Sequence, residues 1–320
     1  MNNILVTGAA GFIGSNLVNH LASDKNNNVF GVDDMSNGHE EFVSSDVRLY
    51  KGISFSDEFI LKSVSRGVFD YVIHLAARPR VSYSVSHPVE TNDVNVTQTL
   101  KLIDACRTNT KRFIFASSSS VYGGADTLPT PETYTKDPKS PYALQKSIIE
   151  DYLSQYSLHY DMDSICLRFF NVFGPHSLGG TPYSTAINSW LTSIMKGEKM
   201  RSDGDGSQSR DVCYVDNVVQ ACELAINYEK RSNTECYNVA TGERVTNNQI
   251  MQRLKEVFPN AEHYDAPWRE GDVMHTQADI TKIKSELGYK DPVSVWQGLD
   301  KTAKWYVDNW HWIKDLKVSM

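Results

Sequence analysis

The sequence predicts an α/β fold: a doubly wound parallel sheet, followed by a smaller α/β region toward the C-terminus. Two observations predict it. Short, continuously apolar runs alternate with helical segments through the first half of the chain, which is typical of parallel strands covered on both faces. After about Phe173 this rhythm gives way to shorter elements punctuated by glycine and proline. With 320 residues, 40% of them hydrophobic, the chain is long enough to bury a substantial core.

The predicted strands are mainly apolar runs of four or five residues. They are residues 3–6, 29–32, 71–75, 113–116 and 164–168. Helices are predicted over about 11–21, 95–107 and 142–159. We expect residues 1–172 to form the sheet domain and residues 173–320 mainly a second domain, with the chain crossing between them more than once. Aromatic residues at helical spacing in 293–314 predict a helix packed on a core.

Composition excludes several classes of protein. A net charge of -7 gives no bulk attraction to nucleic acid or an anionic membrane, so any phosphate site must be local. No run approaches the roughly 20 apolar residues of a membrane span, and no signal-peptide pattern opens the chain. Five scattered cysteines without metal-ligand spacing predict buried thiols, no metal site and a cytoplasmic protein. They are Cys106, Cys166, Cys213, Cys222 and Cys236.

A glycine-rich turn with the spacing GxxGxxG follows the first predicted strand and opens the first helix. Glycines there permit a tight turn, close approach of the backbone to a pyrophosphate, and close helix–strand packing. The free N–H groups of the helix N-terminus favour the same anion. The predicted cofactor-binding residues of this turn are Gly8, Gly11, Phe12, Ile13 and Gly14.

Asp33 ends the second predicted strand, 19 residues after Gly14. A carboxylate there can bind both ribose hydroxyls of NAD and repels the 2′-phosphate of NADP, and no arginine follows it directly. The alternative is a structural turn and an unrelated surface aspartate. Because the turn lies between a strand and a helix, we predict a Rossmann-type domain that binds NAD.

Tyr142 and Lys146 lie four residues apart at the start of a predicted helix and therefore share a face. A free tyrosine, with a pKa of about 10, is a poor base at neutral pH. A nearby ammonium and the positive nicotinamide ring would favour the phenolate and lower that pKa. Ser118, in a serine run that ends a strand, is predicted to relay a proton for a substrate hydroxyl. The alternative is an ordinary exposed helix, on which this spacing is common.

Together these motifs resemble those of the extended short-chain dehydrogenases, and among them the NAD-dependent nucleotide-sugar epimerases and dehydratases. The motifs that carry the resemblance are residues 8–14, 74–77, 117–123, 142–146, 168–175, 204–211 and 269–272. They cover essentially the whole chain. The resemblance also implies a homodimer, formed through the apolar faces of the helices near 97–107 and 142–158.

The resemblance implies further ligand contacts. The additional cofactor-binding residues are Ile53, Ala76 and Asn95. The substrate-binding residues are Ser118, Ser119, Asn171, Arg210, Arg269, Asp272 and Thr276. The UDP portion is expected to be held by Asn171, Arg210, Arg269 and Asp272. Guanidinium forks suit a diphosphate, although Arg210 and Arg269 could instead form surface salt bridges with Asp211 or Glu270. The chain departs from the pattern at Gly52, where many relatives carry an aspartate that binds adenine.

Dehydratase relatives carry Thr-Asp-Glu before Val-Tyr-Gly, and decarboxylating relatives a glutamate, whereas this sequence has serines at 118–120. Epimerisation needs no such acid. The resemblance therefore implies that Tyr142 takes the sugar 4-hydroxyl proton while the C4 hydride passes to NAD. The 4-keto sugar then turns over, and hydride and proton return to its other face without a metal.

Thr276 aligns by motif with a position where epimerases restricted to glucose and galactose resemble one another in carrying a tyrosine. A small residue leaves volume for an N-acetyl group. We therefore predict interconversion of UDP-GlcNAc and UDP-GalNAc, with UDP-Glc and UDP-Gal as secondary substrates, for polysaccharide biosynthesis. One alternative is a UDP-glucuronate 4-epimerase, which needs a cationic or hydroxyl-rich clamp for the carboxylate. A second is a noncatalytic nucleotide sensor, although such proteins commonly lose the tyrosine or the lysine.

Overall fold

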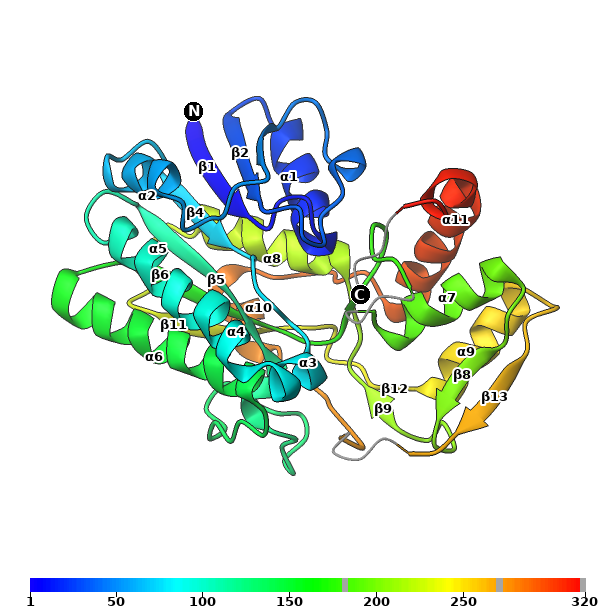
Figure 1. The fold of residues 1–320 in the computed structure, drawn as a ribbon. Helices are drawn as coiled ribbons and strands as arrows, with labels where there is room; N and C mark the ends of the chain where they lie inside the picture. Colours follow the sequence, from blue (N-terminus) through cyan, green and yellow to red (C-terminus); the bar gives the residue numbers. More distant parts are fainter. Residues whose placement is uncertain (180–183, 269–272, 317–320) are drawn as a thin grey trace.

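The main body of the computed structural model is a seven-stranded sheet in the order β11-β6-β5-β4-β1-β2-β3 (Figure 1). The structure describes residues 1–179, 184–268 and 273–316. The strands are β1 (Asn2–Thr7), β2 (Asn27–Asp33), β3 (Arg48–Lys51), β4 (Tyr71–His74), β5 (Arg112–Ser118), β6 (Ser164–Phe169) and β11 (Glu235–Val239). All neighbouring strands are parallel, which confirms the predicted doubly wound sheet.

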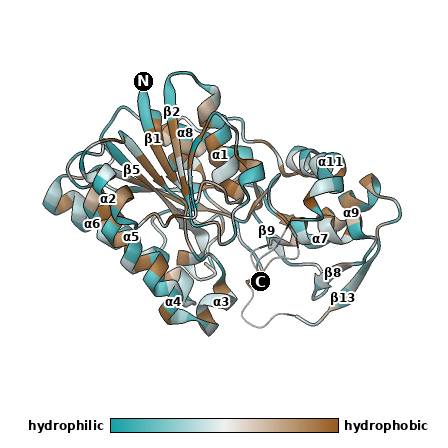
Figure 2. Cartoon of the chain, turned by 45° about the horizontal axis from the view of Figure 1, so that its top comes forward, coloured by the Kyte–Doolittle hydropathy of each residue, from teal (hydrophilic) through white to brown (hydrophobic). Residues whose placement is uncertain are grey.

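Helices cover both faces of this sheet. On one face lie α1 (Phe12–Ser23) and α8 (Val215–Asn227), and on the other α2 (Glu58–Ser65), α5 (Thr99–Cys106) and α6 (Pro141–Tyr160). Side chains of β1 alternate between the two cores, since Ile4 and Val6 face α1 and α8 whereas Leu5 faces the other helices. Figure 2 shows the central strands mostly brown and the helices mixed brown and teal. Burial on both faces explains why the strands are continuously apolar.

The helices that approach the site have clear start signals. Ser140 caps α6, because its hydroxyl accepts a hydrogen bond from the Ala143 N–H at 3.2 Å, and Pro141 occupies the first helical position. The single helix predicted over 95–107 is instead a π-helical stretch, Asp93–Gln98, followed by α5. Two short helices, α3 (Val81–Ser86) and α4 (Pro88–Asn92), precede it and pack on α6.

The second region combines short strand pairs with helices. Its strands are β7 (Val172–Phe173), β8 (Met200–Asp203), β9 (Ser209–Arg210), β10 (Cys213–Tyr214), β12 (Val245–Thr246) and β13 (His263–Ala266). Its helices are α7 (Ala186–Lys196), α9 (Asn247–Val257), α10 (Thr281–Leu287) and α11 (Val295–Ile313). β7 pairs with β10, β9 with β12 and β8 with β13. Between these elements the chain returns to the main sheet as β11, beside β6.

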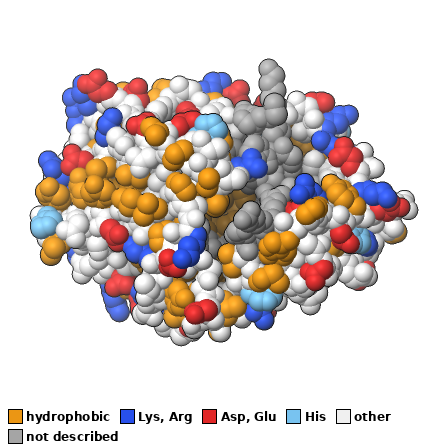
Figure 3. Space-filling view, turned by 60° about the horizontal axis from the view of Figure 1, so that its bottom comes forward, with side chains coloured by type: hydrophobic (Ala, Val, Ile, Leu, Met, Phe, Trp, Pro, Cys, Tyr) orange, Lys and Arg blue, Asp and Glu red, His pale blue; other side chains and the backbone are white. Residues whose placement is uncertain are grey.

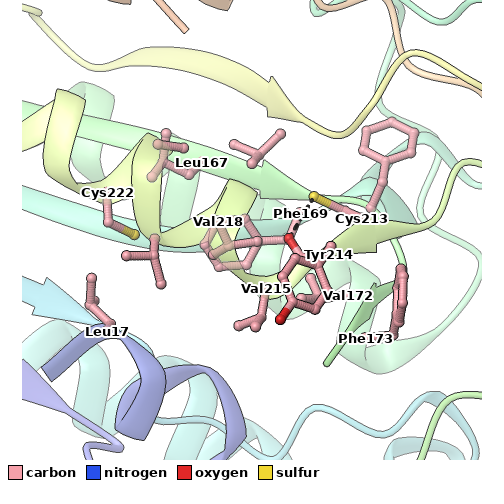
Figure 4. Packing of buried hydrophobic residues seen from close by; sticks show 14 of the residues in the cluster. Leu17, Leu167, Phe169, Val172, Phe173, Cys213, Tyr214, Val215, Val218 and Cys222 are labelled. Carbon is pink, nitrogen blue, oxygen red and sulfur yellow. Dashed lines mark hydrogen bonds between the residues drawn. The ribbon is translucent and has the colours of Figure 1, made fainter. Parts of the chain in front are cut away.

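One hydrophobic cluster continues from the main sheet into the second region. Figure 4 shows part of it, with side chains from α1, β6, β7, β10 and α8 in contact. Helix α11 adds the fully buried Leu299 and Tyr306, whereas its four tryptophans are only partly buried against the cluster. Within the described ranges, four cysteines are buried and Cys236 is partly buried, all as free thiols. No helix in these ranges is both long and apolar enough to cross a membrane.

Candidate active site

A cavity of about 740 Å³ lies where β1, β2, β4, β5 and β6 end, and it extends toward β9. Ligands bind at this edge of open parallel sheets. The predicted site residues that line it are Gly8, Gly11, Phe12, Ile13, Gly14, Asp33, Ala76, Ser118, Ser119, Tyr142, Lys146, Asn171, Arg210 and Thr276. Ile53 and Asn95 do not line it, and Arg269 and Asp272 lie outside the described residues.

The glycine turn fits closely against its surroundings. Gly8 has a φ of +71°, and a Cβ there would lie 2.9 Å from the Ala76 nitrogen. A Cβ on Gly14 would lie 1.9 Å from the Gly8 carbonyl oxygen, so no larger residue fits without moving the helix. The first residues of α1, Phe12 and Ile13, line the cavity and bring unpaired N–H groups of the helix start to it. This turn suits a pyrophosphate.

Asp33 is fixed at the end of β2 by backbone groups. Its Oδ2 accepts a hydrogen bond from the Ala10 N–H, and its Oδ1 accepts one from the Met35 N–H, both at 2.9 Å. Burial raises the pKa of Asp33, while these N–H groups oppose the rise. A carboxylate has about four acceptor positions, so positions remain for ribose hydroxyls. The turn and Asp33 therefore fit a dinucleotide. Gly52 has no side chain, so this position supplies no side-chain contact to adenine, although a Cβ there would meet open space.

Tyr142, Lys146 and Ser118 form one wall of the cavity. The Ser118 hydroxyl lies near enough to the Tyr142 hydroxyl to favour its ionised form. The Lys146 ammonium donates to the Ala116 carbonyl oxygen at 2.7 Å and lies 5.8 Å from the centroid of the Tyr142 ring. The structure thus brings together the three residues predicted to be catalytic.

Burial dominates the ionisation of this pair. It raises the pKa of Tyr142 to about 12, although the neighbouring Ser118 hydroxyl acts in the opposite direction. It lowers the pKa of Lys146 to about 7, against the attraction of the Glu150 carboxylate. The residues of the chain therefore do not themselves produce the lowered tyrosine pKa that the sequence argument predicted. That argument invoked two positive charges, and the chain supplies only one of them.

The pKa of Lys146 predicts a pH dependence of stability. Because it lies below that of a lysine in an unfolded chain, about 10.4, unfolding takes up a proton between these values, and raising the pH through this window stabilises the folded state. From pH 7 to pH 9 we expect cofactor-free wild type to gain about 2 kcal/mol of unfolding free energy relative to Lys146→Met. Urea unfolding at both pH values measures it. Parallel pH dependences would show that Lys146 titrates near its ordinary value.

Asn95 supports the cavity from behind. Its Oδ1 accepts from the Arg78 N–H at 2.7 Å, and its Nδ2 donates to the Arg78 carbonyl at 3.1 Å and to Gln145 Oε1 at 2.8 Å. These bonds commit the buried amide to protein partners, so it holds the loop after β4. Ile53 packs against the hydrophobic core beneath α2 and α5. In this structure the two residues therefore support the surroundings of the cavity without lining it.

The substrate side of the cavity combines Asn171, Arg210 and Thr276 from three separate segments. Asn171 has a φ of +25°, a strained value for a residue with a side chain and one often found at functional sites. Arg210 Nη1 donates to the Ser209 and Met274 carbonyl oxygens. Thr276 Oγ1 is buried and, among the described residues, has no hydrogen-bond partner. Buried polar groups without a partner are rare in proteins.

Asp211 does not form the surface salt bridge with Arg210 that the sequence offered as an alternative to substrate binding. It is fully buried, and its carboxylate accepts hydrogen bonds from the Thr241 hydroxyl and from three backbone N–H groups. The alternative is therefore wrong for this pair. For Arg269 and Glu270 the question lies outside the described residues.

Sequence reasoning missed several cavity residues. They are Ser36, Arg78, Ser120, Lys139 and His176. Arg78 follows the His-Leu-Ala-Ala motif directly, so its position was a usable signal. His176 itself has a φ of +67°, and the sequence gives no signal that this residue lines the cavity. In the described parts of the chain, no three His, Cys, Asp or Glu residues are grouped as a metal site.

The sheet, the glycine turn and the Tyr142–Lys146–Ser118 wall define an NAD-dependent enzyme with the extended short-chain dehydrogenase fold. Residues 4–240 match the model of the NAD dependent epimerase/dehydratase family, and the chain belongs to that family.

Individual relatives cover nearly the whole chain. The UDP-glucose 4-epimerase of Mycolicibacterium smegmatis is 32% identical over 94% of this chain and 97% of its own. A UDP-N-acetylglucosamine 4-epimerase from Methanobrevibacter ruminantium M1, solved with UDP-N-acetylmuramic acid, has a TM-score of 0.90 at 34% identity, covering 96% of this chain and 99% of that one. The UDP-glucuronic acid 4-epimerase from Bacillus cereus, solved with UDP-glucuronic acid and NAD, has a TM-score of 0.87 at 27% identity and the same coverage.

Proposed function

We propose that the chain is a UDP-sugar 4-epimerase whose principal substrates are UDP-GlcNAc and UDP-GalNAc, with UDP-Glc and UDP-Gal as secondary substrates. The observation that carries this proposal is one cavity shared by the dinucleotide turn, by Tyr142 with Lys146 and Ser118, and by Arg210 on the far side. The relatives named above, all 4-epimerases of UDP-sugars, support the reaction class. The enzyme would act in the cytoplasm, where free thiols persist. Its role would be to supply precursors for polysaccharide biosynthesis.

In the proposed mechanism, Tyr142 removes the proton of the sugar 4-hydroxyl and later returns it. Ser118, beside Tyr142 in the cavity wall, orients that hydroxyl and relays the proton. Lys146 is held by the Ala116 carbonyl, and its charged form favours the phenolate. When bound on the glycine turn, NAD supplies the acceptor and donor of the C4 hydride. Arg210 and Asn171 would hold the nucleotide diphosphate while the sugar turns over.

The small side chain of Thr276 is the basis for the proposed N-acetyl substrate. It lines the cavity, and its hydroxyl, which has no partner among the described residues, would donate to an amide carbonyl once the side chain turns toward the substrate. We expect Thr276→Tyr to lower kcat/KM for UDP-GlcNAc by about 100-fold, because the ring fills the N-acetyl space, and to spare UDP-Glc. Steady-state kinetics with both substrates measures this split. Thr276→Ser, which keeps the small size and the hydroxyl, serves as the control, and an unchanged UDP-GlcNAc turnover in the tyrosine variant would contradict the assignment.

UDP-glucuronate is the second candidate substrate, and one observation favours it. Ser118, Ser119 and Ser120 line the cavity together, and the buried Ser120 hydroxyl has no partner among the described residues. Such a hydroxyl-rich wall can bind a carboxylate, the feature that the sequence alone did not reveal. The noncatalytic alternative is less well supported, because Tyr142 and Lys146 are both present and assembled with Ser118.

Proton NMR on purified protein tests the function directly. UDP-GlcNAc, UDP-Glc and UDP-GlcA would each be supplied separately, with and without added NAD, and the H4 and anomeric signals followed. Conversion of UDP-GlcNAc to its C4 epimer supports the proposal. Conversion of UDP-GlcA alone keeps the mechanism and replaces the substrate. If no substrate is converted even with NAD, the proposed activity is wrong.

We further propose that the protein is a homodimer formed through α6, as expected from the sequence, and through α3 and α4 in place of the helix near 97–107. Several apolar side chains of these helices are exposed, and Figure 3 shows orange side chains gathered in a row on this face. They are Val81, Val85, Val89, Leu144, Tyr152, Leu158 and Tyr160. An apolar face of this length is typical of a surface covered by a second copy.

A charge in this face is expected to separate the dimer. Val89 is 83% exposed in the single chain, so Val89→Glu should leave the fold intact and yield a monomer in sedimentation-velocity experiments, since the glutamate would be buried at the interface. Val307→Glu, an exposed site on α11, is the matched control. A dimeric Val89→Glu protein would contradict the proposed interface.

A further inference from the structure

We propose that Arg78 is a latch that retains NAD by tying together the two loops on either side of the cofactor's adenosine ribose. This inference rests on the cofactor placement proposed above, with that ribose at Asp33. Arg78 belongs to the loop after β4, and its partners belong to the loop after β2. Both loops line the cavity.

The guanidinium group bridges the two loops directly. Its Nη1 donates to the Ser36 hydroxyl at 2.6 Å, and its Nη2 lies 3.4 Å from Asp34 Oδ2. Ser36 and Asp34 are themselves joined, because the Ser36 hydroxyl and N–H both donate to Asp34 Oδ1. One side chain therefore connects two loops that both line the cavity.

The latch is fixed at one end and releasable at the other. The backbone of Arg78 is held on both its N–H and its carbonyl by Asn95, which in turn donates to Gln145 on α6. Asn95 and Gln145 are buried, whereas Asp34 is half exposed at the opposite end. Opening therefore requires only the exchange of the Ser36 and Asp34 contacts for water, with the anchor unchanged.

Charge also suits this position for a cofactor with a diphosphate. Asp33 and Asp34 place negative charge beside the cavity, and Glu90 Oε1 lies 4.0 Å from Arg78 Nε. The Arg78 guanidinium opposes these carboxylates at the edge where an anion would enter. Because Gly52 offers no side chain to adenine, retention by a bridge over the ribose supplies what the missing contact would have supplied.

The release rate of NAD tests the latch without depending on activity. Protein loaded with radiolabelled NAD would be chased with excess unlabelled NAD, and the label retained followed over time. We expect Arg78→Ala to accelerate release about tenfold, which corresponds to about 1.4 kcal/mol. Ser36→Ala and Asp34→Asn should accelerate it in the same direction. Arg80→Ala, two residues on and outside the cavity lining, is the matched control and should match wild type.

A double variant separates a latch from a simple charge. If Arg78 acts through Asp34, Arg78→Ala with Asp34→Asn releases NAD no faster than Arg78→Ala alone. If Asp34→Asn instead slows release, Arg78 acts only as a cation near the diphosphate and the latch is wrong. Asp33→Ala separates the two proposals. If Asp33→Ala weakens NAD binding but Arg78→Ala leaves the release rate unaltered, the cofactor placement stands and only the latch is wrong. If Asp33→Ala leaves NAD binding unchanged, the cofactor placement is wrong, and the latch that rests on it is wrong too.

Discussion

Replacing Tyr142 by phenylalanine is expected to lower kcat for UDP-sugar epimerisation by about 10³-fold, while the protein still folds and binds NAD. The hydroxyl is the group that the cavity presents beside Ser118, and the phenyl ring preserves the packing of a side chain that is only 8% exposed. The loss should appear in kcat more than in KM, because the hydroxyl acts on the proton that moves during the reaction.

Tyr152→Phe provides the matched control, since Tyr152 lies on the same helix but at the surface and outside the cavity lining. Its activity should equal that of wild type. Retention of radiolabelled NAD by both variants would show that neither has lost the cofactor site. Undiminished conversion by Tyr142→Phe would mean that another group moves the proton.

Replacing Glu150 by glutamine is expected to lower the free energy of unfolding by about 3–5 kcal/mol. Glu150 is buried on α6 and forms a two-pronged pair with the buried Arg168 of β6, at 2.9 and 2.7 Å. The Ser117 hydroxyl donates to the same carboxylate at 2.6 Å. Removing its charge leaves the Arg168 guanidinium in the interior without a counter-charge, so the folded state is destabilised.

Urea unfolding of Glu150→Gln beside Asp151→Asn would measure this effect. Asp151 is the next residue on the helix and is largely exposed, so its substitution should cost less than about 1 kcal/mol. A double variant with Arg168→Met should recover part of the loss, because it removes the unpaired charge. Equal stability of the two single variants would show that the buried pair contributes little.

The sheet was predictable because the amino-acid composition of each strand reflects its burial on both faces. A strand buried on both faces is mainly apolar, and residues 113–116 show this at every position without reference to the rest of the chain. The helix over 95–107 was less well predicted. A π-helical stretch places Asn95 against the loop after β4, and that backbone contact leaves no periodic signal.

The local parts of the site were predictable for a similar reason. The residues of the glycine turn, and those of the Tyr-xxx-Lys pair, are close together in the sequence. Their spacing therefore predicts how they lie relative to one another. The bridge from Arg78 to Ser36 joins residues 42 positions apart, and only the arrangement of the strands brings them together. The ionisation of Tyr142 was also beyond sequence reasoning, because the spacing of residues does not reveal burial, and burial raises the pKa of this tyrosine.

The position of β11 at the end of the sheet has a consequence for biosynthesis. The ribosome completes β6 well before it reaches β11, and α7 and α8 are made in between. Until then the outer edge of β6 exposes unpaired backbone groups that could pair with another nascent chain. A fragment that ends before β11 keeps this open edge permanently. The nucleotide-binding half therefore depends on the later half of its own polypeptide for protection from aggregation.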